Sequence, residues 1–178
     1  MPQRSELDKS ISAQSAVQPG LVTGQNNQYL TFITAQEEYG IEILCVQEIR
    51  GWEPVTPLPN SPAHLKGVIN LRGNIVPIVD LRLCFGLEEV EYTSITVVIV
   101  LRLHKDSKVK TVGIVVDGVS DVYTVTEDEM RPPPEMGNGQ DTSFIKGLVS
   151  INDKLIILLN VEKLSALSDL KNITLPKP

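Results

Sequence analysis

Side chains that could carry acid–base or nucleophilic chemistry are few and widely separated in this sequence. The two histidines, His64 and His104, each lack a serine, cysteine or acidic pair at a spacing typical of a nucleophile or a metal site. Asp117 and Asp121 alternate with valines, which indicates the polar edge of a strand and turn more simply than a catalytic pair. The residues therefore predict no catalytic site, no metal and no cofactor. A small β-barrel hydrolase using Asp80 or Asp117 stays open as an alternative.

The composition favours a β-rich fold and argues against nucleic acid as a partner. The chain has 178 residues, enough for one domain or two small ones, and only 4% are aromatic, so Val, Ile and Leu must build the core. A formal net charge of −6 offers no basic face to phosphate backbones or anionic lipids. Gly67 and Gly73 are too far apart for a phosphate-binding loop, and no Gly-Lys-Ser follows them.

Nothing in the sequence predicts secretion or a membrane span. Residues 1–27 are polar and lack the apolar core of a signal peptide, and the longest apolar run, Thr96–Leu101, is far shorter than the ~20 residues that cross a bilayer. Cys45 and Cys84 lie in apolar stretches without a C-x-x-C pair, which predicts two buried thiols. We expect a cytoplasmic protein without direct membrane contact.

An internal repeat covers most of the chain. The stretch Lys66–Leu81 recurs as Lys146–Val161, at a constant offset of 80 residues (146 − 66). A second alignment matches Tyr39–Ile41 with Val112–Ile114, at an offset of 73 (112 − 39). Each half is therefore expected to run hairpin, long strand, proline-containing loop, hairpin, which is a duplicated β-module. The offset of 73 also aligns two apolar pairs: Val46 with Val119, and Ile49 with Val122.

The first half is expected to begin with a hairpin. A strand over Tyr29–Thr34 and a turn at Gln36–Glu38 lead into a long second strand, Tyr39–Ile49. A short helix over Ile41–Ile49 stays open as an alternative, because several of its apolar residues have near-helical spacing. Four prolines within Pro54–Pro62 exclude helix and predict an ordered loop or sheet edge.

The second half repeats this order. Thr96–Leu103 and Val109–Val116 predict a hairpin, and Pro132–Gly139 forms the second proline-bearing loop. A short helix is expected after each repeated hairpin, over Leu81–Phe85 and over Val161–Leu167.

Residues that match between the copies indicate structural roles. Asp80 corresponds to Asn160, and each precedes an expected helix, so both are predicted to be N-caps that accept bonds from backbone N–H groups. Gly67 corresponds to Gly147, which is typical of a backbone requirement such as a bulge.

Arg72 differs between the copies, because its counterpart is Asn152. Both residues suit a hairpin turn, so the fold does not require the arginine. Its guanidinium offers five donors in a fixed fork to a partner's carboxylate or carbonyl groups. A solvated surface charge is the alternative.

Several motifs at consistent spacing resemble the CheW family of bacterial chemotaxis coupling proteins. The resemblance runs in uninterrupted order from about Tyr29 to Leu164, and the Asn-Leu-Arg-Gly stretch is its most specific part. The motifs are Tyr39–Ile41, Val46–Gly51, Gly67–Gly73, Pro77–Arg82 and Val112–Val119.

The resemblance implies a mainly β fold of two SH3-like five-stranded β-barrels, with short helices after the repeated hairpins. The expected divisions are a flexible N-terminal arm over 1–27, a CheW-like domain over 28–165, and a C-terminal tail over 166–178. The two intertwined barrels are expected to cover approximately 28–93 and 94–165.

The resemblance also implies a non-catalytic adaptor that couples methyl-accepting chemoreceptors to the histidine kinase CheA in signalling arrays. The expected partners are the cytoplasmic tip of a receptor, the regulatory domain of CheA, and further CheW-like domains in rings. Recruitment to membrane-associated arrays would occur through these partners. An isolated regulatory domain of a kinase-like or CheV-like protein is an alternative, disfavoured because the 178 residues show no ATP-binding or phosphoacceptor segment.

Matched by position, the resemblance implies two sets of binding residues. A receptor helical hairpin would bury apolar side chains in a groove between the barrels, with Arg72 and Glu48 fixing its register. The implied receptor-binding residues are Val46, Glu48, Ile49, Gly67, Arg72, Val97 and Val122. The implied kinase-binding residues are Pro134, Glu135 and Met136, the last standing where the family has a large aromatic residue.

Overall fold

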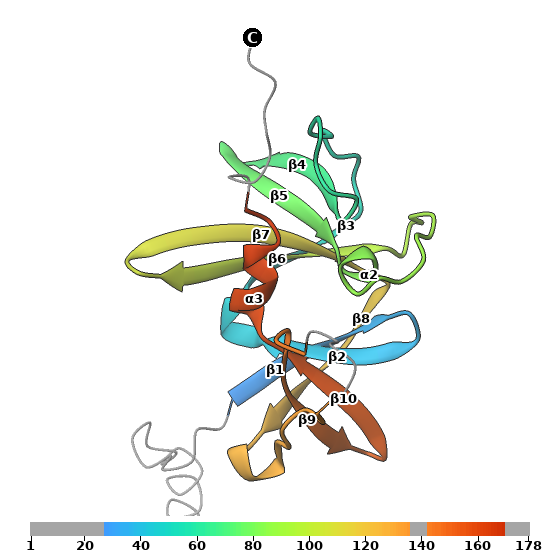
Figure 1. The fold of residues 1–178 in the computed structure, drawn as a ribbon, viewed down its shortest axis with the longest axis vertical. Helices are drawn as coiled ribbons and strands as arrows, with labels where there is room; N and C mark the ends of the chain where they lie inside the picture. Colours follow the sequence, from blue (N-terminus) through green and yellow to red (C-terminus); the bar gives the residue numbers. More distant parts are fainter. Residues whose placement is uncertain (1–26, 136–141, 170–178) are drawn as a thin grey trace, which may run out of the picture.

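A computed structural model of the chain describes residues 27–135 and 142–169, which form two packed β-sheets with two short α-helices (Figure 1). The first half contains β1 (Asn27–Thr34), β2 (Glu37–Glu42), the 3-10 turn η1 (Ile43–Cys45), β3 (Val46–Gly51), β4 (Leu65–Leu71), β5 (Asn74–Asp80) and α2 (Leu81–Cys84). The second half contains β6 (Val97–Lys105), β7 (Lys108–Val116), β8 (Gly118–Val125), the 3-10 turn η2 (Glu127–Glu129), β9 (Ile145–Ile151), β10 (Lys154–Leu159) and α3 (Val161–Ala166). The predicted arm up to residue 26 and the tail from residue 170 lie outside the described residues.

Each sheet combines strands from both halves of the repeat. Sheet A has the order β8-β1-β2-β10-β9, and sheet B has the order β3-β6-β7-β5-β4. The first hairpin of each half is therefore completed by three strands of the other half. The predicted boundary near residue 93 does not separate the two sheets, because β6 and β7 lie beside β3 and β5. The strand pairing described here leaves both sheets open, so closure into SH3-like barrels stays a prediction.

Two equivalent parallel strand pairings, each between one strand of the first half and one of the second, confirm the internal repeat. Gly40 of β2 pairs with Leu158 of β10, and Gly113 of β7 pairs with Ile78 of β5, both in parallel ladders. A Cβ atom on Gly40 would lie 2.8 Å from the Leu158 side chain, and one on Gly113 would lie 2.5 Å from the Ile78 side chain. Both halves have glycine at this position because the side chain of the paired residue occupies the space that a Cβ atom would need.

The predicted long strand Tyr39–Ile49 is wrong, because it is two strands in different sheets. β2 belongs to sheet A and β3 to sheet B, and the residues Ile43–Cys45 form one 3-10 turn between them. The alternative of a short helix over Ile41–Ile49 is also wrong, because only Ile43–Cys45 form a helical turn. The chain crosses from one sheet to the other here.

Four hairpins close with two-residue turns in which both residues have positive φ, the type I′ geometry that matches strand twist. The predicted turn at Gln36–Glu38 is displaced, since Ala35 and Gln36 form it, at φ values of 52° and 70°. Neither is a typical turn residue. The Ala35 amide donates to Asp117 Oδ2 at 2.9 Å, which holds the turn against β7. In the β4–β5 turn, Arg72 and Gly73 take the positive φ values.

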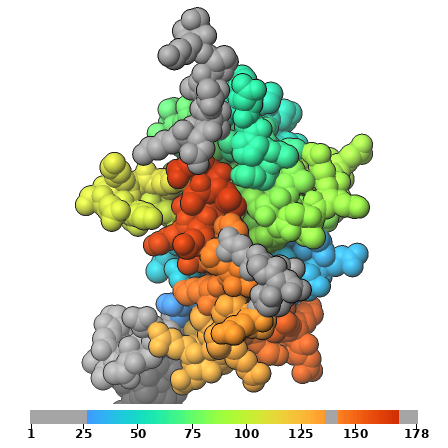
Figure 2. Space-filling view, viewed as in Figure 1, coloured from blue at the N-terminus to red at the C-terminus, as the bar shows by residue number. Residues whose placement is uncertain are grey.

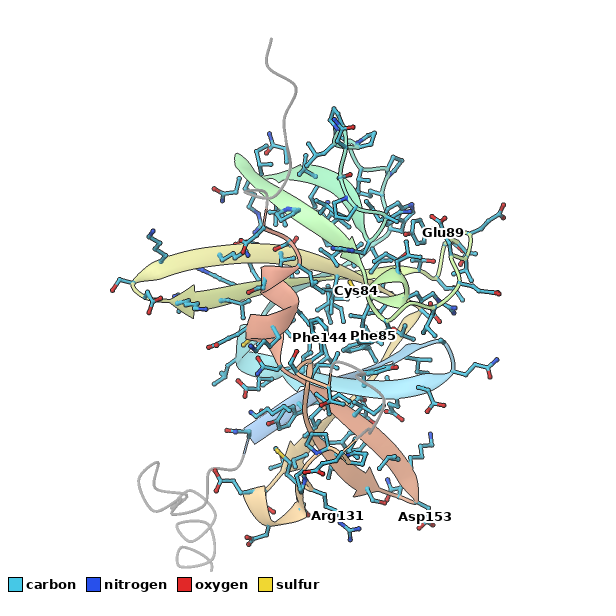
Figure 3. All side chains as sticks on the ribbon, viewed as in Figure 1. Cys84, Phe85, Glu89, Arg131, Phe144 and Asp153 are labelled. Atoms are coloured by element: carbon cyan, nitrogen blue, oxygen red, sulfur yellow. The ribbon has the colours of Figure 1, made fainter. Side chains whose placement is uncertain are left out.

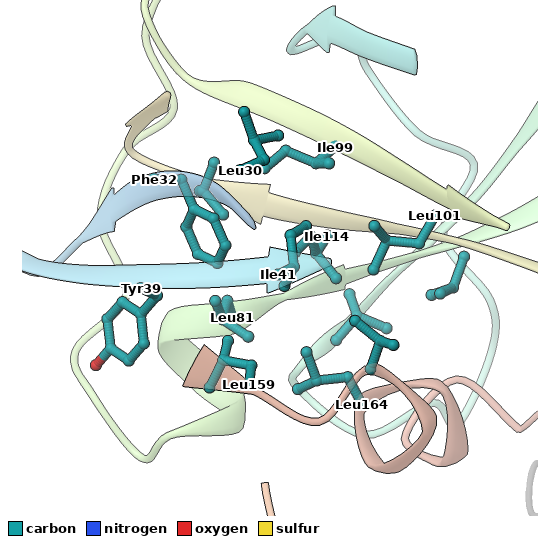
Figure 4. Close-up of a cluster of buried hydrophobic side chains, with 14 of the residues drawn as sticks. Leu30, Phe32, Tyr39, Ile41, Leu81, Ile99, Leu101, Ile114, Leu159 and Leu164 are labelled. Carbon is teal, nitrogen blue, oxygen red and sulfur yellow. The ribbon is translucent and has the colours of Figure 1, made fainter. Parts of the chain in front are cut away.

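The main core lies between the two sheets (Figure 4). The central strands of sheet B are buried on both faces, as continuous apolar runs predict. Ile99 and Leu101 of β6 belong to the cluster shared with sheet A, whereas Val98 and Val100 belong to a second cluster inside sheet B. The inter-sheet cluster also includes Leu30, Phe32, Tyr39, Ile41, Leu81, Ile114, Leu159 and Leu164.

The two predicted helices after the repeated hairpins are present as α2 and α3. Phe85, directly after α2, stacks on Tyr39 of sheet A with ring centroids 5.3 Å apart. Leu164 of α3 is buried in the inter-sheet cluster, and the helix lies beside β6 and β7 in Figure 1. Both helices thus contribute side chains to the core between the two sheets. None of the described helices is long and apolar enough to span a bilayer.

Candidate functional site

An exposed apolar strip begins on β3, the end strand of sheet B. Val46 and Ile49 are three residues apart, so a regular strand would direct them to opposite faces. A bulge between Val46 and Glu48 changes the register, so that Val46 pairs with Leu101 and Ile49 with Ile99. Both partners belong to the inter-sheet core. The bulge therefore turns Val46 and Ile49 to the same side, where Ile49 remains 47% exposed.

The same arrangement recurs on β8, the end strand of sheet A. Val122 pairs with Leu30 and Val119 with Phe32, and a bulge again separates the two pairs. Leu30 and Phe32 belong to the inter-sheet core, and Val122 is 42% exposed. Both end strands therefore present apolar side chains along the edges of one core.

We call these residues the apolar rim. It consists of Val46, Ile49 and Val97 from sheet B and of Val119 and Val122 from sheet A. Val97 packs against the inter-sheet cluster opposite Gly51 of β3. The four predicted apolar receptor contacts thus all lie beside the inter-sheet core, and receptor binding by them stays a prediction.

Val119 is a rim residue that the sequence-based set omitted. Its exposure is similar to that of Val122, and its strand partner is the core residue Phe32. The internal repeat contained the signal, because Val119 is the counterpart of Val46 at the offset of 73 (119 − 46).

Glu48 and Arg72 lie together but on the other face of β3. Glu48 pairs with Val100, a residue of the cluster inside sheet B. Its Oε2 accepts from Arg72 Nη2 at 3.1 Å, and its Oε1 accepts from Arg50 Nη1 at 3.3 Å. The Arg72 side chain is 74% exposed. Arg72 is therefore an exposed cation on the face of β3 opposite to Val46 and Ile49, partly oriented by Glu48.

Gly67 meets a backbone requirement. It is buried, its φ is +146°, and a Cβ atom there would lie 2.2 Å from the Thr56 carbonyl oxygen. Thr56 bridges to Val68 of β4, so the proline loop crosses directly over Gly67. At the matching Gly147, a Cβ atom would lie 2.5 Å from Met130 Cγ. The bulge predicted for Gly67 is present between Leu65 and Gly67, and a direct receptor contact stays a prediction.

The predicted kinase-binding residues follow η2. Pro134 and Glu135 are exposed and lie just after Arg131, which bridges to Leu148 of β9. Met136 lies outside the described residues.

Asp80 is an N-cap, as predicted. Its Oδ1 accepts from the backbone amides of Arg82 at 2.9 Å and Leu83 at 3.4 Å, while Oδ2 accepts from the Tyr92 hydroxyl. Burial and this bond to Asp80 hold the pKa of Tyr92 far above its usual range. Asn160 caps α3 in the same way, through bonds from the amides of Glu162 and Lys163. Asp80 therefore also anchors the segment that follows α2.

Asp117 joins the two sheets at the second chain crossing, between β7 and β8. Its oxygens accept from Arg82 Nε at 3.0 Å and Arg82 Nη2 at 2.5 Å. Burial by itself would raise the pKa of Asp117, but the bonds from Arg82 and from the Ala35 amide outweigh it and lower the pKa below the ordinary value of 3.8. Both carboxylates of the alternative hydrolase are thus engaged in structural bonds.

Asp117→Asn should lower the melting temperature at pH 7 and have less effect in acid. Because the folded-state pKa is depressed, the charged bonds stabilise fully above the unfolded value of 3.8 and are lost as pH falls through the folded value. Thermal melts of both proteins from pH 7 to about pH 2 check this, with Asp106→Asn on the exposed β6–β7 turn as the control. A gap that persists undiminished in acid would show that the carboxylate charge is not its source.

Both cysteines are half-buried, so the prediction of two buried thiols is wrong in degree. Burial raises the pKa of Cys84 to about 12 and also raises that of Cys45. Cys45 lies in η1 and Cys84 at the end of α2, positions where the chain leaves its strands. Their thiols are nevertheless held in the protonated, weakly nucleophilic form.

Comparison with known proteins settles the family. The model of the CheW-like domain matches residues 28–168. This chain belongs to the CheW-like domain family. The chemotaxis protein CheW of Klebsiella aerogenes is 48% identical over 145 residues, covering 82% of this chain and 84% of that protein. The chemotaxis protein CheW of Rhizobium meliloti is 36% identical over 141 residues, covering 79% and 88%.

A solved CheW structure supports the same conclusion. The scaffolding protein TtCheW from Thermoanaerobacter tengcongensis superimposes with a TM-score of 0.68 at 30% identity, covering 76% of this chain and 90% of that one. The CheW resemblance seen in the motifs is confirmed. The chain is a chemotaxis coupling adaptor of the CheW family.

Proposed function

We propose that the apolar rim binds the helical cytoplasmic tip of a methyl-accepting chemoreceptor, and that the adaptor links this tip to CheA without catalysing a reaction. The observation that carries the proposal is the pair of bulged end strands. Two bulges turn apolar side chains of both sheets toward the edges of one core, where Ile49 and Val122 stay nearly half-exposed. Apolar residues held on rigid strands suit the apolar stripe of a helix.

Apolar burial supplies most of the affinity in this proposal, at roughly 25 cal/mol per Å² of apolar surface removed from water. Arg72 and Glu48 lie on the other face of the end strand β3. In this proposal, a helix that passes over the edge of β3 reaches them, and their polar contacts set its register. Glu48 already holds Arg72 and Arg50, so the guanidinium of Arg72 is oriented before a partner arrives. Gly67 contributes by allowing the proline loop to cross β4.

The regulatory domain of CheA is proposed to bind the exposed segment at Pro134, Glu135 and Met136. Further CheW-like domains would contact the same adaptor in rings, and recruitment to membrane-associated arrays would follow from these contacts. Receptor state would reach the kinase as a difference in contact energy that shifts the population of active kinase. For the fold, we propose SH3-like barrels over about 28–93 and 94–165, exchanging strands as sheets A and B do.

Arg72→Ala is expected to leave the melting temperature nearly unchanged and to weaken receptor binding about tenfold, equivalent to about 1.4 kcal/mol. The exposed ion pair with Glu48 contributes only about 0–1 kcal/mol to stability. Alanine also has a Cβ atom, so the positive φ of the turn costs no more than before. Co-sedimentation with a receptor cytoplasmic fragment measures the loss.

Arg131→Ala is the matched control, since Arg131 is another exposed arginine and its bridge to Leu148 uses backbone atoms. A pull-down with CheA alone should give equal capture of the parent chain and of Arg72→Ala, because Arg72 lies away from the proposed kinase segment. If Arg72→Ala unfolds the chain, the arginine is a structural member of sheet B and its proposed role is wrong.

A further inference from the structure

Arg50 of β3 lies between two carboxylates. Its Nη1 donates to Glu48 Oε1 at 3.3 Å, and its Nη2 donates to Glu53 Oε2 at 3.1 Å. Side chains two residues apart on a strand point to the same face, so Arg50 and Glu48 lie side by side. Both are partly buried, whereas Arg72 is largely exposed. A chain of contacts therefore runs from the partly buried Arg50 through Glu48 to the exposed Arg72.

The stem of Arg50 is held as well as its guanidinium. Arg50 pairs with Val98 of β6, at the edge of the apolar cluster inside sheet B. It lines a small hollow there together with Val55, Ile69 and Ile78. The methylene groups of an arginine can cover apolar side chains while its head bonds to polar groups. With both parts engaged, Arg50 is a fixed point beside Glu48.

The internal repeat shows that the fold does not need this guanidinium. At the offset of 73, Arg50 corresponds to Tyr123 of β8 (123 − 50), and Glu48 corresponds to Asp121 (121 − 48). Tyr123 packs against an apolar cluster within sheet A, so an uncharged side chain supports the equivalent strand. Asp121 forms no ion pair with any residue that the structure describes. Two arginines on one glutamate are thus a feature of the first half alone.

Arg72 has one hydrogen bond within the described part of the chain, from its Nη2 to Glu48 Oε2. A guanidinium has five N–H donors, so most of them remain for a partner. An exposed arginine loses much conformational freedom on binding unless its position is already restricted. Glu48 can restrict Arg72 only if its own carboxylate is fixed. The bond from Arg50 to Oε1 provides this, and it leaves Oε2 for Arg72.

We propose that Arg50 is a positioning residue for the receptor contact, because it fixes Glu48, which in turn holds Arg72 in the orientation that a receptor helix meets. Arg50 itself does not touch the receptor. This inference rests on the proposed function, since that function gives Arg72 its polar contact with the receptor. It adds that the contact depends on a residue beneath the binding surface.

A double-mutant cycle tests the proposal. Arg50→Gln removes the charge but keeps a stem over the small hollow, so the melting temperature should stay nearly unchanged. Receptor affinity should fall about threefold to fivefold, less than for Arg72→Ala, because Arg50 acts only through Arg72. The double variant should bind about tenfold more weakly than the parent, as Arg72→Ala does alone, whereas independent contacts would multiply to about 30-fold to 50-fold. Titration of a labelled receptor fragment measures all four affinities.

Arg50→Lys separates position from charge. Lysine keeps the positive charge, but its compact ammonium cannot bond to Glu48 and Glu53 in the way that the planar fork does. Arg50→Lys should therefore also weaken receptor binding. Parent affinity for Arg50→Lys would show that charge alone is needed, and would overturn the positioning role.

Arg131→Gln is the matched control, because it removes the same charge from another exposed arginine. In Figure 2 the first proline loop, which follows Glu53, lies at the upper end of the molecule in teal, and Figure 3 marks Arg131 at the lower end. Receptor affinity of Arg131→Gln should equal that of the parent chain. An equal loss for Arg131→Gln and Arg50→Gln would overturn the proposal, since net charge would then explain both.

Side-chain NMR of the free chain tests the positioning without a receptor. The order parameter of the Arg72 Nε–H group should fall in Arg50→Gln and in Glu48→Gln. The proposal is overturned if this order parameter is unchanged in Arg50→Gln, or if the losses in the cycle multiply. Parent affinity for Arg72→Ala would overturn the proposed receptor contact of Arg72, and the positioning role with it. The order parameters distinguish that failure from a failure of positioning alone.

Discussion

Gly67→Ala is expected to lower the melting temperature by roughly 10 °C, corresponding to about 3 kcal/mol of unfolding free energy. Two costs combine at this residue. A φ of +146° is strained for any residue with a Cβ atom, and that atom would lie 2.2 Å from the Thr56 carbonyl oxygen. The proline loop must therefore lift from β4 or the strand must distort. Thermal and urea denaturation measure the loss.

Two other glycines separate these costs. Gly73 has a φ of +85°, but a Cβ atom there would meet no other atom within 4 Å, so Gly73→Ala should cost only about 1 kcal/mol. Gly51 has open space and no positive φ, so Gly51→Ala should be nearly neutral. If Gly67→Ala proves as stable as Gly51→Ala, the crossing of the proline loop over β4 is not as described.

Ile49→Asp or Val122→Asp should abolish measurable receptor binding, with a loss of about 100-fold or more, while the protein stays folded. Each side chain is about half-exposed, so a carboxylate can reach water in the free protein. In the complex, the same carboxylate would be buried against an apolar helix without a partner, which costs several kcal/mol. Titration of a labelled receptor fragment gives the affinities, and circular dichroism confirms folding. Val119→Asp should behave in the same way, because β8 repeats the arrangement of β3.

Leu155→Asp is the matched control. Leu155 is 58% exposed on β10 and lies outside the rim, so the substitution introduces the same charge at a similar exposure. Its receptor affinity should equal that of the parent chain. Equal losses for Leu155→Asp and Ile49→Asp would mean that negative charge, and not the rim, governs receptor binding.

Features fixed by neighbouring residues could be predicted from the sequence. The repeated hairpins, the helices that follow them and the caps at Asp80 and Asn160 depend on local turn and capping chemistry, and all are present. The displaced first turn was not predictable in this way. Ala35 and Gln36 carry no turn signature, and their conformation depends on Asp117, which lies 82 residues away along the chain.

The candidate site depended more on tertiary structure. Val46 and Ile49 face the same side only because of a bulge, which the alternating pattern of β3 does not reveal. The pairing of Arg72 with Glu48 on the opposite face depends on how the β4–β5 turn meets β3. The exchange of strands between sheets left no local signal, since Tyr39–Ile49 has the composition of one continuous strand.

Because strands are exchanged between the sheets, the proposed receptor-binding surface and the proposed kinase-binding segment are expected to unfold together. Neither half of the polypeptide holds a complete sheet, because each sheet takes strands from both halves. Unfolding is consequently expected as one all-or-none event, in which both edge strands and the segment after η2 are lost together. A damaged molecule would then drop out of the array altogether, and would not occupy a receptor while failing to engage its kinase.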